Sequence, residues 1–241
     1  MRVKEFEGEV EHKNVNRYNL RGNRRLLILK KSSIGFVLAV TLVLFGCSSN
    51  SSIEKQLSTT MAKMNSAEKV SRDAQGELTE LEKLEQELFY ETMELSHEQL
   101  GEVKIKVTEL EELLGQRLAQ IKGEEKSIRK ATKSMDELDV IIEQVDGDVK
   151  KSIEELKIAV SNRYELHSSF VVEYKKLTSL QKELYEMLVV VETRLMGLED
   201  KVGEVNAQNE VVRSAVTSFN DATLKVNTLK DAAFVGLQDE E

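Results

Sequence analysis

Cys47 is the single cysteine of this 241-residue chain, and its thiol is the side chain with the clearest potential chemistry. One cysteine cannot form an intramolecular disulfide framework or a cysteine-cluster zinc site. The uncharged residues 34–45 precede it, and Lys30 and Lys31 lie before that run. A basic flank, an apolar stretch of about 7–15 residues and a small residue form a secretory signal pattern. The surroundings of Cys47 therefore predict export, with processing next to the cysteine.

The stretch "LFGC", which ends at Cys47, resembles the lipobox at which bacterial lipoproteins are processed. Leu44 and Gly46 have the branched and small side chains of that motif, and Phe45 is bulkier than the usual residue. The resemblance implies that diacylglycerol is attached to the Cys47 sulfur and that a signal peptidase cuts after Gly46. Two acyl chains are enough for stable membrane anchoring.

An uncleaved signal anchor, in which Cys47 is incidental, is the alternative interpretation of this segment. A membrane-spanning helix needs about 20 apolar residues. Extending the apolar run to that length would bury Lys30 and Lys31, which is costly. We therefore expect residues 1–46 to be a signal peptide.

The first residues of the chain do not look like the start of a signal peptide. The stretch "EFEGEVEHK" is acidic, whereas a signal n-region is basic. We expect translation to begin downstream, at a non-Met codon such as that of Leu26, Leu27 or Leu29. Residues 1–25 would then be a mis-assigned start.

Charge is divided unevenly along the chain. Residues 1–46 carry nine basic and four acidic side chains, whereas the rest carries 25 basic and 39 acidic ones, a net charge of −14. An acidic body is repelled by nucleic acid, by anionic lipid headgroups and by wall polyanions. We therefore expect no nucleic-acid partner.

The composition after the signal predicts long helices. The chain has no proline, and 32% of its residues are charged; proline is the residue that interrupts helix interiors. Residues 47–52 hold Cys47 followed by "SSNSS", a polar tether with little reason to fold. A pattern of apolar residues with helical periodicity follows. It is interrupted at residues 95–100, at Gly147 and near Thr193.

These interruptions divide residues 53–241 into a bundle of helices. Ser96 and Gln99 have capping-box spacing. The predicted helices lie near 53–95, 97–145, 148–190 and 194–236. Their similar lengths and short connections favour an all-α, up-and-down, antiparallel four-helix bundle that is partly coiled-coil. One long coiled coil is the alternative.

The predicted helices differ in the quality of their apolar seams. In the first helix Ser, Thr and Ala residues dilute a seam that includes Leu57 and Met64. We expect the membrane-proximal half of that helix to pack loosely. Asn209 lies on the seam of the fourth helix, where a lone Asn usually fixes register.

Three stretches resemble the YkyA-type cell-wall-binding lipoproteins of Gram-positive bacteria. They are "LEKLEQELFYETMELS", "RYELHSSFVVEYKKLTSLQKELYEML" and "FNDATLKVNTLKDAAF". The resemblance covers most of the chain from about residue 80 onward, and the lipobox agrees with it. It implies an all-helical bundle on the outer face of the membrane, and it supplies no established catalytic residues.

Tyrosines of the third predicted helix provide one candidate binding surface. Tyr164, Tyr174 and Tyr185 recur at heptad-compatible spacing, with His167 in the same stripe. Tyrosine has a flat apolar face and a polar hydroxyl. If the rings are exposed, we expect Tyr164 and Tyr174 to stack on the sugars of a glycan. The alternative is that the rings close the shoulder of the bundle and direct their hydroxyls to water.

The sequence contains no catalytic or metal-binding pattern. His97 and His167 lack metal-ligand spacing, and we expect both at the surface or the shoulder of the bundle. The many carboxylates are expected on solvated helix faces. We therefore expect no enzyme activity, no metal and no cofactor other than the diacylglycerol on Cys47.

Together these features predict a lipid-anchored protein on the outer face of the cell membrane. We expect a non-enzymatic module that binds peptidoglycan or acts as a spacer. A weak binding face could suffice because the anchor raises the effective concentration. The alternative is a scaffold that docks envelope proteins without touching the wall.

Overall fold

Helices make up nearly all of the described part of the chain. The computed structural model describes residues 52–190 and 195–239, so Leu44, Phe45, Gly46 and Cys47 lie outside it. The α-helices are α1 (Ser52–Ala67), α2 (Lys69–Glu94), α3 (Leu100–Thr132), α4 (Asp136–Ile142), α5 (Gly147–Leu188) and α6 (Leu195–Asp239). Two short 3-10 helices are η2 (His97–Gln99) and η3 (Lys133–Met135). No strand occurs within the described ranges, which confirms the predicted all-α fold.

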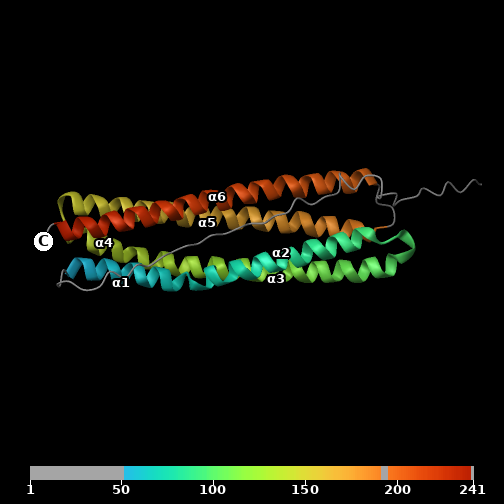
Figure 1. The fold of residues 1–241 in the computed structure, drawn as a ribbon, viewed down its shortest axis with the longest axis horizontal. Coiled ribbons are helices and arrows are strands. Elements are labelled where there is room, and N and C mark those ends of the chain that lie inside the picture. Colours follow the sequence, from blue (N-terminus) through green and yellow to red (C-terminus); the bar gives the residue numbers. More distant parts are fainter. Residues whose placement is uncertain (1–51, 191–194, 240–241) are drawn as a thin grey trace, which may run out of the picture.

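These helices form four long antiparallel rods (Figure 1). The first rod is α1 with α2, because helical hydrogen bonding continues through Glu68. Its N–H donates to the Met64 carbonyl at 3.0 Å, and its carbonyl accepts from Arg72 N–H at 3.1 Å. The second rod is α3, η3 and α4, and the third and fourth rods are α5 and α6. The up-and-down order is the predicted one.

Two turns lie where the sequence predicts them. Between α2 and α3, the Ser96 N–H donates to Gln99 Oε1 at 3.0 Å, the capping contact that their spacing indicates. At the turn from α4 into α5, Gly147, the first residue of α5, has φ +60°, a left-handed conformation that glycine adopts at low cost. The third predicted turn, with Thr193, lies outside the described residues.

The rods pair as two hairpins that lie side by side. α2 packs along α3 in the first hairpin, α5 packs along α6 in the second, and α3 contacts α5 between them. Residues 143–146 connect the two hairpins. The start of α1, this connection and the end of α6 lie at one end of the bundle, and the α2–α3 turn lies at the other (Figure 1). We call these the proximal and distal ends.

The apolar core has two parts, one in each half of the bundle. The distal part includes Phe89, Leu110 and Val205, and the proximal part includes Leu57 and Ile153. Leu57 and Met64 are buried, so the first half of the first rod packs more tightly than its composition predicts. Asn209 is buried on α6, as its place in the seam indicates. Among the described helices, none combines the length and apolarity needed to cross a membrane.

Candidate functional site

The three tyrosines of the predicted binding face are buried. Tyr164, Tyr174 and Tyr185 are 5%, 1% and 0% exposed. Their side of α5 faces the first hairpin, and each hydroxyl donates to a carboxylate of the first rod: Tyr164 to Glu68, Tyr174 to Glu82, and Tyr185 to Glu85. The premise of an exposed tyrosine face is therefore wrong. The alternative placed the rings at the shoulder of the bundle with their hydroxyls directed to water. It is wrong about the hydroxyls, because they donate to carboxylates.

The carboxylates belong to three buried polar clusters that cross between the hairpins. The Arg163 cluster contains Glu68, Arg163, Tyr164 and Thr223. The Glu124 cluster contains Ser71, Glu124, Ser127 and His167. The Arg117 cluster contains Glu82, Glu85, Arg117, Tyr174, Gln181 and Tyr185.

In the Arg163 cluster, a guanidinium and a carboxylate form a two-bond pair. Arg163 Nη1 and Nη2 donate to Glu68 Oε1 and Oε2 at 2.8 and 2.9 Å. Arg163 Nε donates to Thr223 Oγ1 at 2.8 Å, and its guanidinium lies 4.7 Å from the centroid of the Phe219 ring. Such bidentate and cation–π contacts fix orientation as well as adding energy. The cluster therefore ties α5 to the first rod and to α6.

The Tyr164 hydroxyl completes this cluster as a donor. It donates to Glu68 Oε1 at 2.7 Å. Burial, together with the nearby Glu68 charge, raises the pKa of Tyr164 well above its ordinary value. The hydroxyl therefore keeps its proton, and it serves as a fixed hydrogen-bond donor to Glu68 rather than as an acid.

The Arg117 cluster puts one cation among two carboxylates. Arg117 is 2% exposed; its Nη1 donates to Glu85, and its Nη2 lies 3.4 Å from Glu82 Oε1. Its Nε donates to the Tyr174 hydroxyl at 2.8 Å, and that hydroxyl donates to Glu82 at 2.8 Å. Gln181 accepts from Arg117 at 3.1 Å and donates to Glu85 at 3.0 Å. Every member therefore bonds to at least one other.

Electrostatics keep Arg117 charged despite its burial. Burial opposes the charged form of Arg117, but attraction to Glu85 and Glu82 raises its pKa well above the ordinary value. For Glu82, burial dominates and raises the carboxyl pKa, although Arg117 and Tyr174 partly offset the effect. Burial also raises the pKa of Tyr174 and Tyr185, so both hydroxyls remain donors.

The Glu124 cluster lies between the other two and is less completely bonded. Ser71 Oγ donates to Glu124 Oε1 at 3.1 Å, and Ser127 Oγ donates to the Ala67 carbonyl at 2.6 Å. His167 Nε2 lies 3.1 Å from Glu124 Oε1, but its ring is not oriented to hydrogen-bond there. Within the described ranges, Glu124 Oε2 has no hydrogen-bond partner. At this level of the core, Glu124 Oε2 and His167 Nε2 could each form a hydrogen bond that the described residues do not supply.

Two expectations about charged residues are corrected here. His167 is buried rather than at the surface or shoulder, and Glu68, Glu85 and Glu124 are buried rather than on solvated faces. A signal was present in the sequence: Arg117 lies between Leu114 and Ile121 in the apolar repeat of α3, and Glu124 follows at the same spacing. Charged residues at such core positions predict buried ion pairs.

The remaining predicted residues have simpler outcomes. His97 lies in η2. No group of three or more His, Cys, Asp or Glu side chains within 52–190 and 195–239 is arranged to hold a metal ion. The lipidation residue Cys47 and the processing residues Leu44, Phe45 and Gly46 lie outside the described residues, so their chemistry stays a prediction.

Comparisons with known proteins place most of the chain in one lipoprotein family. Residues 52–234 match the YkyA family, described as "putative cell-wall binding lipoprotein". The chain is 26% identical over 199 residues to "uncharacterized lipoprotein YkyA" of Bacillus subtilis (strain 168), covering 82% of this chain and 89% of that protein. No solved structure matches significantly. The family match spans every residue of the three buried clusters.

Proposed function

Because the chain belongs to the YkyA family of lipoproteins, we propose that it is a lipid-anchored, non-enzymatic module on the outer face of the cell membrane that binds or spaces the cell wall. The family description supports a wall partner, and the similarity of "LFGC" to a lipobox supports the anchor. In this proposal diacylglycerol on Cys47 is the covalent attachment, and the helical bundle is the extracellular part.

The position of the helices relative to Cys47 carries the proposal. α1 begins at Ser52, five residues after Cys47, so the intervening chain spans at most about 18 Å. The lipid would therefore hold the proximal end of the bundle at the membrane. The 42 residues of α5 extend about 63 Å at 1.5 Å per residue. The distal turn could thus reach about 60 Å from the bilayer.

The charged side chains of the buried clusters pair with one another inside the bundle. Within each of the Arg163 and Arg117 clusters, the cation binds carboxylates of the same cluster. The bidentate pair of Arg163 with Glu68 is one example. A partner would then bind an outer surface, at weak intrinsic affinity reinforced by the anchor. The net charge of −14 after Gly46 disfavours anionic wall polymers and leaves peptidoglycan strands as the better partner.

Cell fractionation tests the anchor. A Cys47→Ser variant should leave the membrane fraction or retain its signal peptide, because the thioether to diacylglycerol cannot form. Mass spectrometry of the membrane-extracted wild-type protein should identify lipidated Cys47 as its first residue. A Ser51→Ala variant, outside the lipobox, should remain membrane-bound. Normal processing and membrane retention of Cys47→Ser would disprove the anchor.

Wall binding is tested separately with purified peptidoglycan. The detergent-solubilised protein should co-sediment with peptidoglycan, and excess soluble glycan fragments should release it. Absence of retention, together with protein-only adducts after crosslinking in cells, would instead support the scaffold that docks envelope proteins. Peptidoglycan adducts in cells would support the spacer or binding module.

A further inference from the structure

A small cavity lies where α1, α5 and α6 meet, next to the Arg163 cluster. Its volume of about 40 Å³ is roughly three times the ~10–15 Å³ that one water needs. Part of its wall is apolar, from Met61, Val160 and Val226. Another part is polar, from Asn65, Asn227 and Lys230. The cavity can therefore take a group larger than a single water that has a polar and an apolar side.

Glu68, the carboxylate that borders this cavity, already accepts hydrogen bonds from Arg163 and Tyr164. Glu68 Oε1 accepts from Arg163 Nη1 at 2.8 Å and from the Tyr164 hydroxyl at 2.7 Å. Its Oε2 accepts from Arg163 Nη2 at 2.9 Å. The Arg163 charge thus balances the Glu68 charge, and Glu68 does not neutralise another cation in the cavity.

Among the described residues that line the cavity, Lys230 is a cation whose ion pair is not with a buried carboxylate. The residue is 9% exposed, and its ammonium lies 3.3 Å from the Asp231 carboxylate. The Asp231 side chain is 73% exposed, and an ion pair with such a solvated partner contributes little. A buried ammonium with a weak partner favours an additional anion beside it.

The two asparagines add hydrogen-bonding capacity to the same cavity. Asn65 Oδ1 accepts from Arg72 Nη1 at 2.8 Å, which leaves the Asn65 amide N–H groups to donate. The Asn227 side chain forms no hydrogen bond to another described residue. The cavity therefore presents donors and a positive charge, and it matches an acceptor that carries negative charge.

We infer that this cavity binds a carboxylate group carried on a small apolar substituent. Lys230 neutralises the carboxylate, Asn65 and Asn227 donate to its oxygens, and Met61 and Val226 contact the apolar part. The acidic surface of the protein does not prevent this, because salt screens distant charges over about 8 Å. A free short-chain acid or the C-terminal alanine of a wall peptide would supply this chemistry; the second source rests on the proposed function.

Titration of the full-length, detergent-solubilised protein with propionate tests the inference. With ¹⁵N-labelled asparagine, saturable shifts of the Asn65 and Asn227 side-chain amides are expected at constant ionic strength. Propionamide has the same shape without the charge, so it should bind at least 10-fold more weakly. Equal binding of the two compounds, or no saturable shift with propionate, would overturn the inference.

Substitution of the cation provides the second test. Lys230→Met keeps an apolar stem in the cavity but removes the charge, so propionate affinity should fall at least 10-fold. Lys225→Met, at an exposed position of the same helix, is the matched control and should leave affinity unchanged. If Lys230→Met does not fold, Asn227→Asp places a negative charge beside the cavity and should cause the same loss. A folded variant of either kind that binds propionate like the wild type would contradict the inference.

N-acetyl-D-alanine distinguishes the two sources. Binding of this compound at the same asparagines would support a wall peptide, whereas binding of propionate alone would support a free acid. The propionate result does not depend on peptidoglycan co-sedimentation. Carboxylate binding in the cavity can therefore be confirmed even if wall binding fails. Wall binding can likewise be confirmed even if the cavity binds no carboxylate.

Discussion

Arg117 places a permanent positive charge inside the bundle, between carboxylates of α2 and polar groups of α5. Removing two opposite charges from water is expensive, and their attraction offsets that cost only when geometry and hydrogen bonding are good. The Arg117 cluster meets this condition, because Tyr174 and Gln181 bond to the guanidinium as well. The cluster should therefore be sensitive to loss of a single partner.

Arg117→Met should destabilise the protein by about 3–5 kcal/mol, because the buried Glu85 and the largely buried Glu82 would lose their cation. Urea unfolding at pH 7 followed by circular dichroism measures the free energy of unfolding. Arg129→Met is the matched control: Arg129 is 69% exposed and its pair with Glu125 should contribute at most about 0.5 kcal/mol. Similar losses in the two variants would show that the Arg117 cluster is not a coupled network.

Glu82 should make the stability depend on pH in a defined direction. Burial raises its pKa above the ordinary value of 4.5, so the folded protein binds this proton more tightly than the unfolded chain does. The contribution of Glu82 is therefore fully present at low pH and is lost as pH rises from about 4.5 through the raised pKa. Glu82→Gln cannot ionise, so its stability relative to the wild type should increase between pH 5 and pH 7.

Paired urea titrations at the two pH values measure this difference. Glu87→Gln, at an exposed position of α2, is the control and should show a smaller change in relative stability over the same interval. A Glu82→Gln variant that loses relative stability as pH rises would reverse the sign and contradict the assignment.

At the scale of the helices, Gly147 determines how the two hairpins connect. Its φ of +60° is the conformation that residues with a Cβ adopt with difficulty, and nothing lies within 4 Å of an added Cβ. Gly147→Ala should therefore destabilise through backbone strain alone, by about 1–2 kcal/mol. Gly203→Ala, in the interior of α6 with equally open surroundings, should stabilise by about 0.5–1 kcal/mol. Thermal unfolding of the two variants should show opposite signs, and equal signs would contradict the conformational explanation.

The helices show which features of this fold can be predicted from sequence. The turn at Ser96 and the one at Gly147 have local signals, a capping spacing and a glycine, so the helix ends near them were predictable. The burial of the tyrosine stripe was not predictable. Heptad spacing places a residue on a stripe but does not say whether its neighbour across the core is apolar or charged. Tyr174 is buried since Arg117 and Glu82 face it from other helices, a contact that no local pattern encodes.

At the scale of the whole molecule, the bundle consists of two hairpins joined covalently at residues 143–146, at the proximal end. Polar side chains bridge the hairpins in its interior, because Tyr185 and Gln181 of α5 reach Glu85 of α2. The Arg163 cluster forms a second bridge, from Arg163 to Glu68. Such directional contacts fix the register of the two hairpins, so the bundle can hold its full length from the proximal end to the distal turn.

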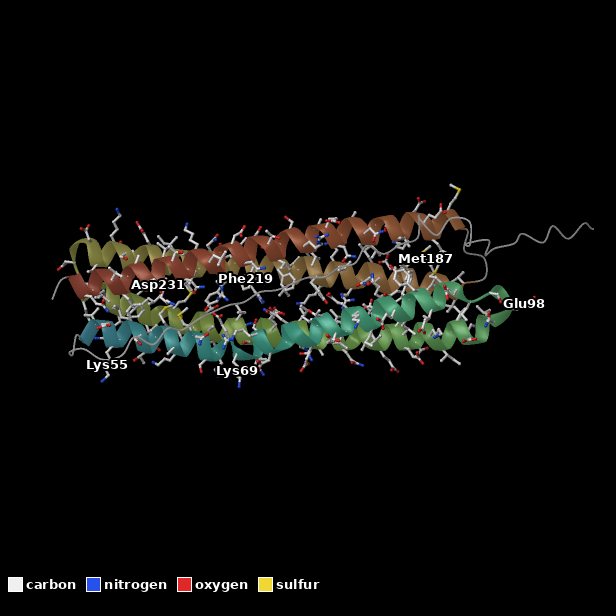
Figure 2. The ribbon with its side chains drawn as sticks, in the orientation of Figure 1. Lys55, Lys69, Glu98, Met187, Phe219 and Asp231 are labelled. Carbon is white, nitrogen blue, oxygen red and sulfur yellow. The ribbon has the colours of Figure 1, made fainter. Side chains whose placement is uncertain are left out.

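A lipid-anchored bundle is expected to point away from an anionic membrane surface. Lys55 and Glu98 lie near opposite ends of the bundle (Figure 2), and both are exposed. With Cys47 lipidated, a Lys55→Cys or Glu98→Cys variant has a single free thiol for a fluorescent label. In vesicles with anionic lipids and an acceptor on the headgroups, energy transfer should be strong from position 55 and weak from position 98, because the acidic body is repelled by the surface.

Raising the salt concentration provides the control for that repulsion. Screening weakens the force that keeps the bundle away from the lipids, so transfer from position 98 should increase with salt, whereas transfer from position 55 should change little. Neutral vesicles should resemble the high-salt result at any ionic strength. Equal transfer from the two positions in anionic vesicles at low salt would mean that the bundle lies along the membrane, and a spacer role would then be excluded.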